Sequence, residues 1–426
     1  MGSISTQLES VYRLKCSCNS YPWGKQGKNS LSARLCENGQ GWTGDGPNQD
    51  FKVDESKPYA EMWMGTYPVL PSYVHSTGED LQDVIDRYSN ELVGEQVIKK
   101  FGHSKLPYLP KVLSIAKALP LQLHPNKEKA SKLHEEKPDA FTDPNHKPEI
   151  ALALTEFEAF CGFKPLKQIA DLMKLDSLHR FMPAEGNAPD AEFTDDILKE
   201  VVRNMLETDD DAVTETFNFL TRTSPDRFKE LNAEHIPKLA PRLAQQYDQS
   251  DPGILVALIT MNYLVLQPGE SIYIPADGIH AYLSGDIIEC MARSNNVLNT
   301  GLCPKAERSN VELFCSCLMF SPHSPEESLL RSKQYQRGRQ GKTNVFAPPM
   351  SEFNVLETKL AGGEREELAA VNGPSIVVVT KGSASMEANG KQYELEEGYV
   401  FFVAQGVELD FNAGKEGVLM HTIFVE

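Results

Sequence analysis

The stretch of sequence that decides the fold is Leu119-Pro120-Leu121-Gln122-Leu123-His124-Pro125-Asn126-Lys127. Gln122 and His124 alternate with leucines, so on a β-strand both polar side chains point to the same face. If a strand points an amide and an imidazole inward and its leucines outward, the inward side chains need a polar partner, such as a bound ion or ligand, inside the fold. We therefore expect this strand to line a binding site.

Two later segments supply partners for this strand. Glu149 stands at the head of the apolar segment Glu149-Ile150-Ala151-Leu152, and His280 follows the turn Pro275-Ala276-Asp277-Gly278. With the amide and imidazole of the first stretch, they form a set of two imidazoles, one carboxylate and one amide oxygen. Two imidazoles and a carboxylate with a labile further position are the ligand type of a catalytic zinc site. The sequence therefore indicates a metal site whose donors come from distant segments.

Length, composition and charge narrow the class of protein. A chain of 426 residues is too long for one ordinary core, so two or three domains are expected. Hydrophobic residues make up 40% of the chain. No apolar run approaches the ~18 residues of a membrane span, which predicts a soluble, globular protein. The net charge of −18 argues against nucleic acid or an anionic membrane surface as the main partner. An anionic ligand would need a locally basic pocket.

The cysteines and the N-terminus indicate a cytoplasmic protein. Eight scattered cysteines are too few for a disulfide framework, and no hydrophobic leader is present. The pairs Cys16/Cys18 and Cys315/Cys317 are interpreted as alternate residues of strands. Met1 and Gly2 begin a segment that fits the N-myristoylation pattern, but no basic patch follows. We interpret it as a disordered terminus.

The local pattern changes twice along the chain. Residues 1–165 show strand and turn signals, whereas residues 166–254 show a helical period, with an apolar face between 197 and 206. Strand signals return from Leu255 to Leu266. A charged connector is expected over 326–342, and residues 353–426 are again punctuated as strands and turns. This last segment contains a single histidine and no histidine–carboxylate pair at strand spacing, so no metal is expected there.

The motifs described above resemble those of the type I mannose-6-phosphate isomerases, a zinc-dependent cupin family. The resemblance covers most of the first 310 residues in the family's order. Its segments are Tyr21–Lys25 (Y-P-W-G-K), Lys57–Gly65 (K-P-Y-A-E-M-W-M-G), Lys111–Asn126, Asn145–Glu149, Cys161–Pro165 (C-G-F-K-P) and Gly278–Lys305.

The resemblance implies a mainly β fold with a helical insertion, made of two cupin (jelly-roll) barrels and an α-helical domain. Residues 1–165 would form the N-terminal part of the catalytic cupin domain, and 255–330 the remainder. Residues 166–254 would form the helical domain. Residues 331–426 would form a C-terminal cupin-like barrel without metal.

The resemblance also implies the roles of individual residues. One zinc ion per chain would be bound by Gln122, His124, Glu149 and His280. Residues expected in the catalytic site are Glu289, Lys147, Lys305, Tyr282 and Asn299. Residues expected to bind substrate are Trp23, Glu61 and Lys127.

Several positions depart from the family pattern. The family segment S-D-N-x-x-R-A-G reads Ser294-Asn295-Asn296-Val297-Leu298-Asn299-Thr300-Gly301, so Asn299 replaces an arginine that the family uses in catalysis. Pro120 replaces a serine associated with phosphate. Pro22 and Tyr67 also differ from the family residues. These changes predict a diverged paralogue, in which Arg293 is a candidate to replace the missing cation.

The function implied is a zinc-dependent aldose–ketose isomerase that interconverts mannose 6-phosphate and fructose 6-phosphate. It would supply mannose for GDP-mannose and glycan synthesis, acting in the cytoplasm as a monomer on a small phosphorylated sugar. The alternative is a zinc-retaining, weakly active or inactive sugar-binding paralogue, because of Asn299 and Pro120. A cupin oxygenase with iron at two histidines and a carboxylate is a third possibility, disfavoured by Gln122 as a fourth ligand.

Overall fold

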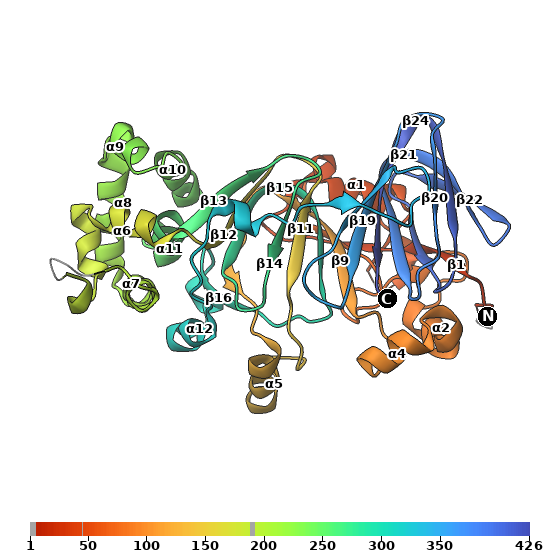
Figure 1. Cartoon of the computed structure of the whole chain (residues 1–426), viewed down its shortest axis with the longest axis horizontal. Helices are drawn as coiled ribbons and strands as arrows, with labels where there is room; N and C mark the ends of the chain where they lie inside the picture. The colour runs from red at the N-terminus through yellow and green to blue at the C-terminus, as the bar shows by residue number, and fades with distance from the viewer. Residues whose placement is uncertain (1–5, 45, 188–191) are drawn as a thin grey trace.

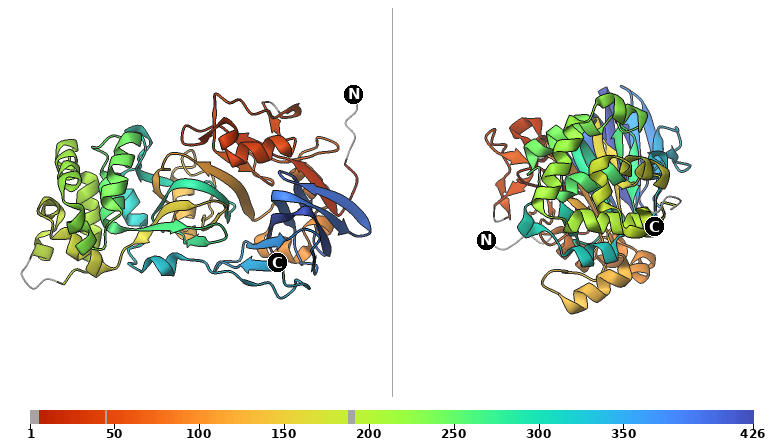
Figure 2. Two further views of the ribbon diagram at one scale, coloured as in Figure 1. Left: turned by 90° about the horizontal axis from the view of Figure 1, so that it is seen from above. Right: turned by 90° about the vertical axis from the view of Figure 1, so that its left-hand side faces the viewer.

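The computed structural model describes residues 6–44, 46–187 and 192–426. The Met1-Gly2 pattern considered for myristoylation lies outside them. The described chain is elongated: a group of helices occupies one end, a large β assembly the middle, and a second β assembly the other end (Figure 1). The view from above shows the same order (Figure 2). Among the described residues, the helices are too short or too polar to traverse a bilayer.

The middle assembly is a 12-stranded sheet that combines strands from both sides of the helical segment. Its longest strand, β15, follows the helical segment and pairs with four strands that precede it, β9, β10, β11 and β12. The strands are β2 (Ser17–Asn19), β4 (Trp42–Thr43), β5 (Gly46–Asp50), β7 (Glu61–Trp63), β9 (Tyr108–Ile115), β10 (Leu121–Leu123), β11 (Glu149–Ala153), β12 (Phe157–Phe163), β13 (Met261–Leu266), β14 (Ser271–Ile274), β15 (His280–Ala292) and β16 (Leu298–Gly301).

The second assembly is a 10-stranded sheet built mostly from the C-terminal segment. The strand β1, from the start of the described chain, is inserted between β23 and β8. The strands are β1 (Val11–Lys15), β8 (Tyr73–Val74), β17 (Lys333–Gln334), β18 (Thr343–Phe346), β19 (Asn354–Leu360), β20 (Arg365–Leu368), β21 (Ser375–Ala388), β22 (Lys391–Glu396), β23 (Val400–Val403) and β24 (Leu409–Phe424).

The helices gather mainly between β12 and β13. This group consists of α6 (Leu166–Met173), α7 (Asp195–Glu207), α8 (Asp210–Arg222), α9 (Pro225–Glu230), α10 (Ile236–Gln246) and α11 (Pro252–Thr260). The remaining helices are α1 (Leu31–Asn38), α2 (Leu81–Arg87), α3 (Ser89–Leu92), α4 (Glu95–Phe101), α5 (Lys127–Glu136) and α12 (Val311–Cys317). Large β-sheets with a helical group therefore make up the fold, while the exact domain boundaries stay a prediction.

The helical group fixes which way the strands beside it face. Leu121 and Leu123 of β10 are buried in one apolar cluster with the helices. Ile279, just before β15, and Ala281 and Leu283 within it belong to the same cluster. Because side chains alternate on a strand, Gln122, His280 and Tyr282 face the opposite way, into the sheet assembly. The helices thus cover the outer face of the strands that carry the polar residues.

Two predictions about secondary structure are wrong. The apolar run 255–266 was expected to be a strand, but its first part belongs to α11, whose residues are all buried. A helix buried on every side has no polar face, so the period of the sequence did not reveal it. Cys315 and Cys317 lie in the helix α12 and are not alternate residues of a strand.

The C-terminal sheet contains a histidine–carboxylate pair that strand spacing could not reveal. His421 of β24 stands opposite Glu357 of β19, with its Nε2 atom 3.5 Å from Oε2. The two residues are far apart in sequence and meet only through strand pairing. A C-terminal assembly without metal stays a prediction.

A buried lysine ties β12 to the helical group. Lys164 is 2% exposed, and its Nζ donates to the carbonyls of Leu258 at 2.8 Å and Ile259 at 3.3 Å, at the C-terminal end of α11. Carbonyl groups at a helix C-terminus favour a cation. Burial nevertheless lowers the pKa of Lys164 to about 7.

We predict that Lys164 makes stability rise with pH above neutrality. Its ordinary pKa is 10.5, so between pH 7 and 10.5 the unfolded chain binds a proton that the folded chain lacks. The melting temperature of the parent, relative to Lys164→Met, should therefore rise by about 2–4 °C from pH 7.5 to 9.5. Exposed Lys238 provides the control, Lys238→Met, which should keep the parent's pH dependence. Parallel curves for parent and Lys164→Met would contradict the prediction.

Candidate metal centre and active site

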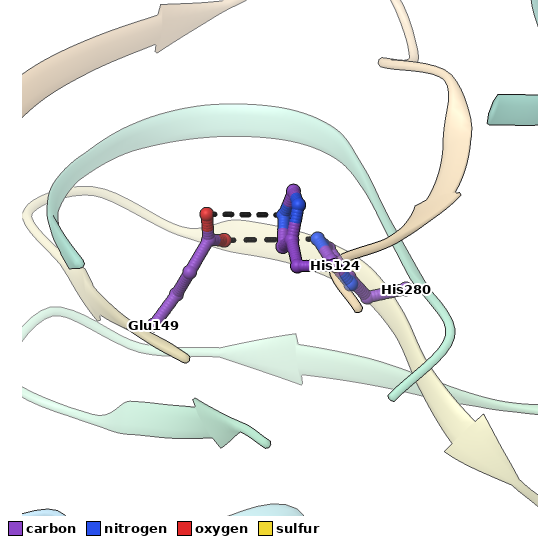
Figure 3. A group of neighbouring side chains, drawn as sticks. All are labelled: His124, Glu149 and His280. Atoms are coloured by element: carbon purple, nitrogen blue, oxygen red, sulfur yellow. Dashed lines mark ion pairs between the residues drawn. The ribbon is translucent and has the colours of Figure 1, made fainter. Parts of the chain in front are cut away.

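A buried carboxylate that faces two neighbouring imidazoles forms the centre of the site (Figure 3). Glu149 begins β11 and is 1% exposed, with Oε1 3.2 Å from His124 Nε2 and Oε2 3.6 Å from His280 Nε2. Both histidines are fully buried. Among the described residues this is the one group of three histidine, cysteine or acidic side chains whose donor atoms cluster, all within 4.8 Å of one another.

The far side of each imidazole is held by a backbone carbonyl. The Nδ1 atom of His124 lies 2.8 Å from the carbonyl of Asn296, and that of His280 lies 3.0 Å from the carbonyl of Gly278. A carbonyl only accepts, so each Nδ1 carries the proton and each Nε2 presents a lone pair. These two Nε2 atoms are buried and have no hydrogen-bond partner among the described residues.

This arrangement fits a metal ion. Two lone pairs and a carboxylate facing one another repel, whereas a cation between them would satisfy all three. Histidine ligands held by carbonyls through their second nitrogen are typical of metal centres. The donor set of two histidines and a carboxylate suits zinc.

Gln122 is placed to add a fourth donor. It stands directly opposite His280 on β15 and opposite Asn299 on β16. Directly opposed residues of antiparallel strands have side chains on one face, about 5 Å apart at Cβ. The register therefore brings Gln122 and Asn299 beside the histidines.

Burial and nearby charge set the protonation of the three donors. Burial lowers the pKa of His280 to about 4 and also lowers that of His124, so both imidazoles are neutral at pH 7. Burial alone would raise the pKa of Glu149, but the positive charge of Lys147 holds it well below its usual range. The Nζ of Lys147 lies 3.2 Å from Oε1 of Glu149. Neutral imidazoles and an ionised carboxylate are the forms that bind a metal.

Tyr282 and Glu289 face the same interior. Tyr282 is fully buried and its hydroxyl donates to Oε2 of Glu149 at 3.2 Å. Glu289 is buried on β15, opposite Ala151 of β11, two residues along from Glu149. Burial, and then the charge of Glu149, raises the pKa of Glu289 to about 8.

A buried lysine links Glu289 to Glu61, and sequence reasoning did not assign it a role. Lys111 of β9 has its Nζ 3.5 Å from Glu289 Oε2 and 3.6 Å from Glu61 Oε1. It also lies 4.4 Å from the centre of the Trp63 ring, whose Nε1 donates to Glu61 at 2.7 Å. The sequence feature that could have indicated this role is a lone lysine within the apolar run Tyr108–Ile115. A charged side chain in a buried strand requires partners of opposite charge.

In the described part of the chain, three other predicted site residues form no hydrogen bond or ion pair with the metal donors. Lys305 is exposed and its Nζ lies 2.5 Å from Asp210 Oδ2, on α8. Lys127 begins α5 and lines a surface cavity. Trp23 is half-buried and packs against the apolar cluster that contains Tyr282.

Comparison with known proteins reveals the family of the chain. Residues 11–166 match the family described as "Phosphomannose isomerase type I, catalytic domain", and residues 345–391 match "Phosphomannose isomerase type I C-terminal". The protein named mannose-6-phosphate isomerase from Schizosaccharomyces pombe is 36% identical over 438 residues, covering 98% of this chain and 100% of that protein. The chain belongs to the type I phosphomannose isomerase family. A second relative with the same name, from Candida glabrata, is 34% identical over 97% of this chain and 98% of that protein.

Solved structures of phosphomannose isomerases share this fold. The Salmonella typhimurium mannose 6-phosphate isomerase bound to substrate (f6p) and zinc superposes with a TM-score of 0.78. It is 23% identical and covers 98% of this chain and 100% of that chain. The likeness confirms the predicted family fold of large β-sheets with helices.

We predict that metal binding stabilises the folded protein. The three donors come from β15, β11 and the end of β10, so an ion joining them stabilises the folded state, by about 2.7 kcal/mol at 100 times its Kd. Chelation should lower the melting temperature, and added zinc should restore it. His280→Ala should have the melting temperature of the chelated parent, and added zinc should not raise it. The control His179→Ala, at an exposed histidine, should show the same zinc-dependent rise in melting temperature as the parent. Equal melting temperatures with and without metal would contradict the site.

Proposed function

We propose that this chain interconverts mannose 6-phosphate and fructose 6-phosphate as a zinc-dependent isomerase. The observation that carries the proposal is the buried His124–Glu149–His280 group in a chain that matches mannose-6-phosphate isomerases over its whole length. The wider role is to supply mannose for GDP-mannose and glycan synthesis. The finer architecture we propose is two cupin barrels joined to the helical domain. We propose that the chain acts as a monomer, an assignment supported by the three donors belonging to one chain.

Zinc would be held by His124, Glu149, His280 and Gln122. When bound, it supplies a Lewis acid that polarises the oxygens on the two carbons between which the proton moves. The uncompensated Nε2 atoms support this assignment, because they are buried and point at the same carboxylate.

Glu289 is the group that we assign to proton transfer. An aldose–ketose isomerisation removes a proton from one carbon and returns it to its neighbour, so the base must also act as an acid. A carboxyl whose pKa is raised to about 8 exchanges protons near neutral pH. Lys111 contacts Glu289 and Glu61, and it keeps the charges of this buried network in balance.

Cations around the carboxylates would stabilise the negative charge that develops on the sugar. Lys147 and Lys111 are buried beside Glu149 and Glu289. Tyr282 supplies a neutral hydrogen-bond donor at the same place. A role for Lys305 in phosphate binding requires that it leave its ion pair with Asp210, which is exposed and therefore weak.

We predict that Glu289→Gln abolishes turnover while the protein remains folded and binds metal. An amide cannot exchange the proton, so kcat should fall by about 10²–10⁴. The measurement is a coupled assay that converts fructose 6-phosphate formed from mannose 6-phosphate into a reduced nicotinamide signal. Glu416→Gln, at an exposed glutamate, is the matched control and should keep the parent's rate. A zinc-loaded parent without turnover would instead support a sugar-binding paralogue.

We predict that Asn299→Arg raises kcat. The Oδ1 of Asn299 is buried without a hydrogen-bond partner among the described residues, and the residue stands opposite Gln122, beside the metal donors. A cation there would stabilise charge in the transition state and raise kcat by about tenfold, with a smaller effect on KM. A parent that already turns over rapidly, with no gain from Asn299→Arg, would show that another cation stabilises the charge in the transition state.

Pro120→Ser should act mainly on KM, and the double variant with Asn299→Arg tests whether the two gains add.

A further inference from the structure

A cavity of about 760 Å³ is lined by residues other than the metal donors. Its wall is formed by the end of α4 and the loop after it, by Tyr67, by residues 142–145, by Lys127 at the start of α5, and by Arg293 and Asn295. In Figure 1, α4 and α5 lie on the same lower side of the molecule. The volume is in the range of small-molecule sites.

The cavity carries more positive than negative charge. Lys105, Lys127 and Arg293 line it, and none of them makes an ion pair within the described part of the chain. Of the two carboxylates present, Glu352 is already paired with His146 at 2.6 Å. The other, Asp143, accepts hydrogen bonds from the backbone amides of Asn145 and Asn295, both at 3.0 Å. In a chain of net charge −18, such a local excess of cations favours the binding of an anion.

Arg293 is the cation whose setting is most specific. Its Nη1 donates to Thr66 Oγ1 at 3.0 Å and its Nη2 to the Thr66 carbonyl at 2.8 Å, and the guanidinium lies 5.2 Å from the centre of the Tyr67 ring. These neutral groups fix its orientation without neutralising its charge. Burial lowers the pKa of Arg293, which shows the cost of keeping this charge away from water. A guanidinium has five N–H donors, so several remain to bind an anion in a forked geometry.

The cavity is connected to the metal centre through two strand ends. Arg293 follows β15, two residues beyond Met291, which stands opposite Glu149. Asn145 lines the cavity two residues before Lys147, and its backbone carbonyl accepts from Asn296, the residue that holds His124. One strand end and one hydrogen bond thus join residues that line the cavity to residues that hold the metal donors.

We propose that this cavity binds the phosphate monoester group of a small metabolite, with Arg293 as the main contact and Lys105 and Lys127 as additional charges. The phosphate belongs either to the sugar that reacts at the metal centre or to a second phosphorylated metabolite. Binding itself does not depend on the proposed function, whereas the first of these two sources does.

Binding is tested with inorganic phosphate as the probe, titrated calorimetrically into the zinc-loaded full chain at low salt. Arg293→Met should raise the Kd at least tenfold, and Lys105→Met, at an exposed position, should raise it about threefold. The charge-matched controls Arg331→Met and Lys333→Met, at exposed positions without ion pairs in the described chain, should leave it unchanged. His280→Ala separates this site from the metal and should retain binding. An unchanged Kd in both Arg293→Met and Lys105→Met, or no saturable binding by the parent, would overturn the proposal.

If Arg293→Met fails to fold, Arg293→Lys, which keeps the charge but not the fork, together with Lys105→Met, decides the matter. Kinetics then identify the source of the phosphate. Competitive inhibition by phosphate against mannose 6-phosphate, with KM raised in Lys105→Met and kcat kept, assigns the cavity to the substrate. Inhibition or activation that is not competitive, with KM unchanged in Lys105→Met, assigns it to a second metabolite. The calorimetric result holds even if the chain shows no isomerase activity.

Discussion

The site depends on burying the carboxylate of Glu149, which is 1% exposed. An ionised carboxylate away from water is costly unless charges and hydrogen bonds compensate it. Here the Lys147 ammonium and the Tyr282 hydroxyl compensate part of its charge, while the two neutral imidazoles that face it leave the rest to a bound cation. The helical group packs on the outer face of β10 and β15 and so fixes the inward direction of their polar residues. Chain segments separated by more than a hundred residues must therefore be in register before the anion is compensated.

The pKa values of the two buried carboxylates, Glu149 and Glu289, are shifted in opposite directions. Lys147 overcomes the effect of burial on Glu149 and lowers its pKa, whereas burial and the neighbouring negative charge raise the pKa of Glu289 to about 8. Pairs of acids whose environments separate their pKa values are typical of sites with distinct ionic roles. One carboxylate can remain a permanent anion for a cation to bind, while the other can exchange a proton. Lys111 adds a positive charge between Glu289 and Glu61, which limits how far the pKa of Glu289 rises.

The sequence predicted the parts of this arrangement that follow from local alternation and from family motifs. The inward direction of Gln122 and His124 came from two leucines, and the helical character of residues 197–206 came from their period. Local patterns failed where tertiary structure decides the outcome. The helix α11 is buried on every side, so its period carries no signal. The His421–Glu357 pair and the Lys111 network arise from strand register, and the basic cavity arises from loops that meet in space.

Local charge must outweigh the net charge of −18 if the protein is to bind a sugar phosphate. Exposed charges are screened over about 8 Å at physiological ionic strength, so distant surface carboxylates have little influence within a pocket. Buried cations are screened much less. Lys111 and Lys147 stand next to the carboxylates of the interior, and Arg293 stands at the end of β15 without a carboxylate partner in the described chain. Asn299 places a neutral amide on β16, opposite Gln122, whereas Arg293 follows the far end of β15. A substrate bound in this protein would then be oriented by where its phosphate finds positive charge, and by the metal centre at its other end.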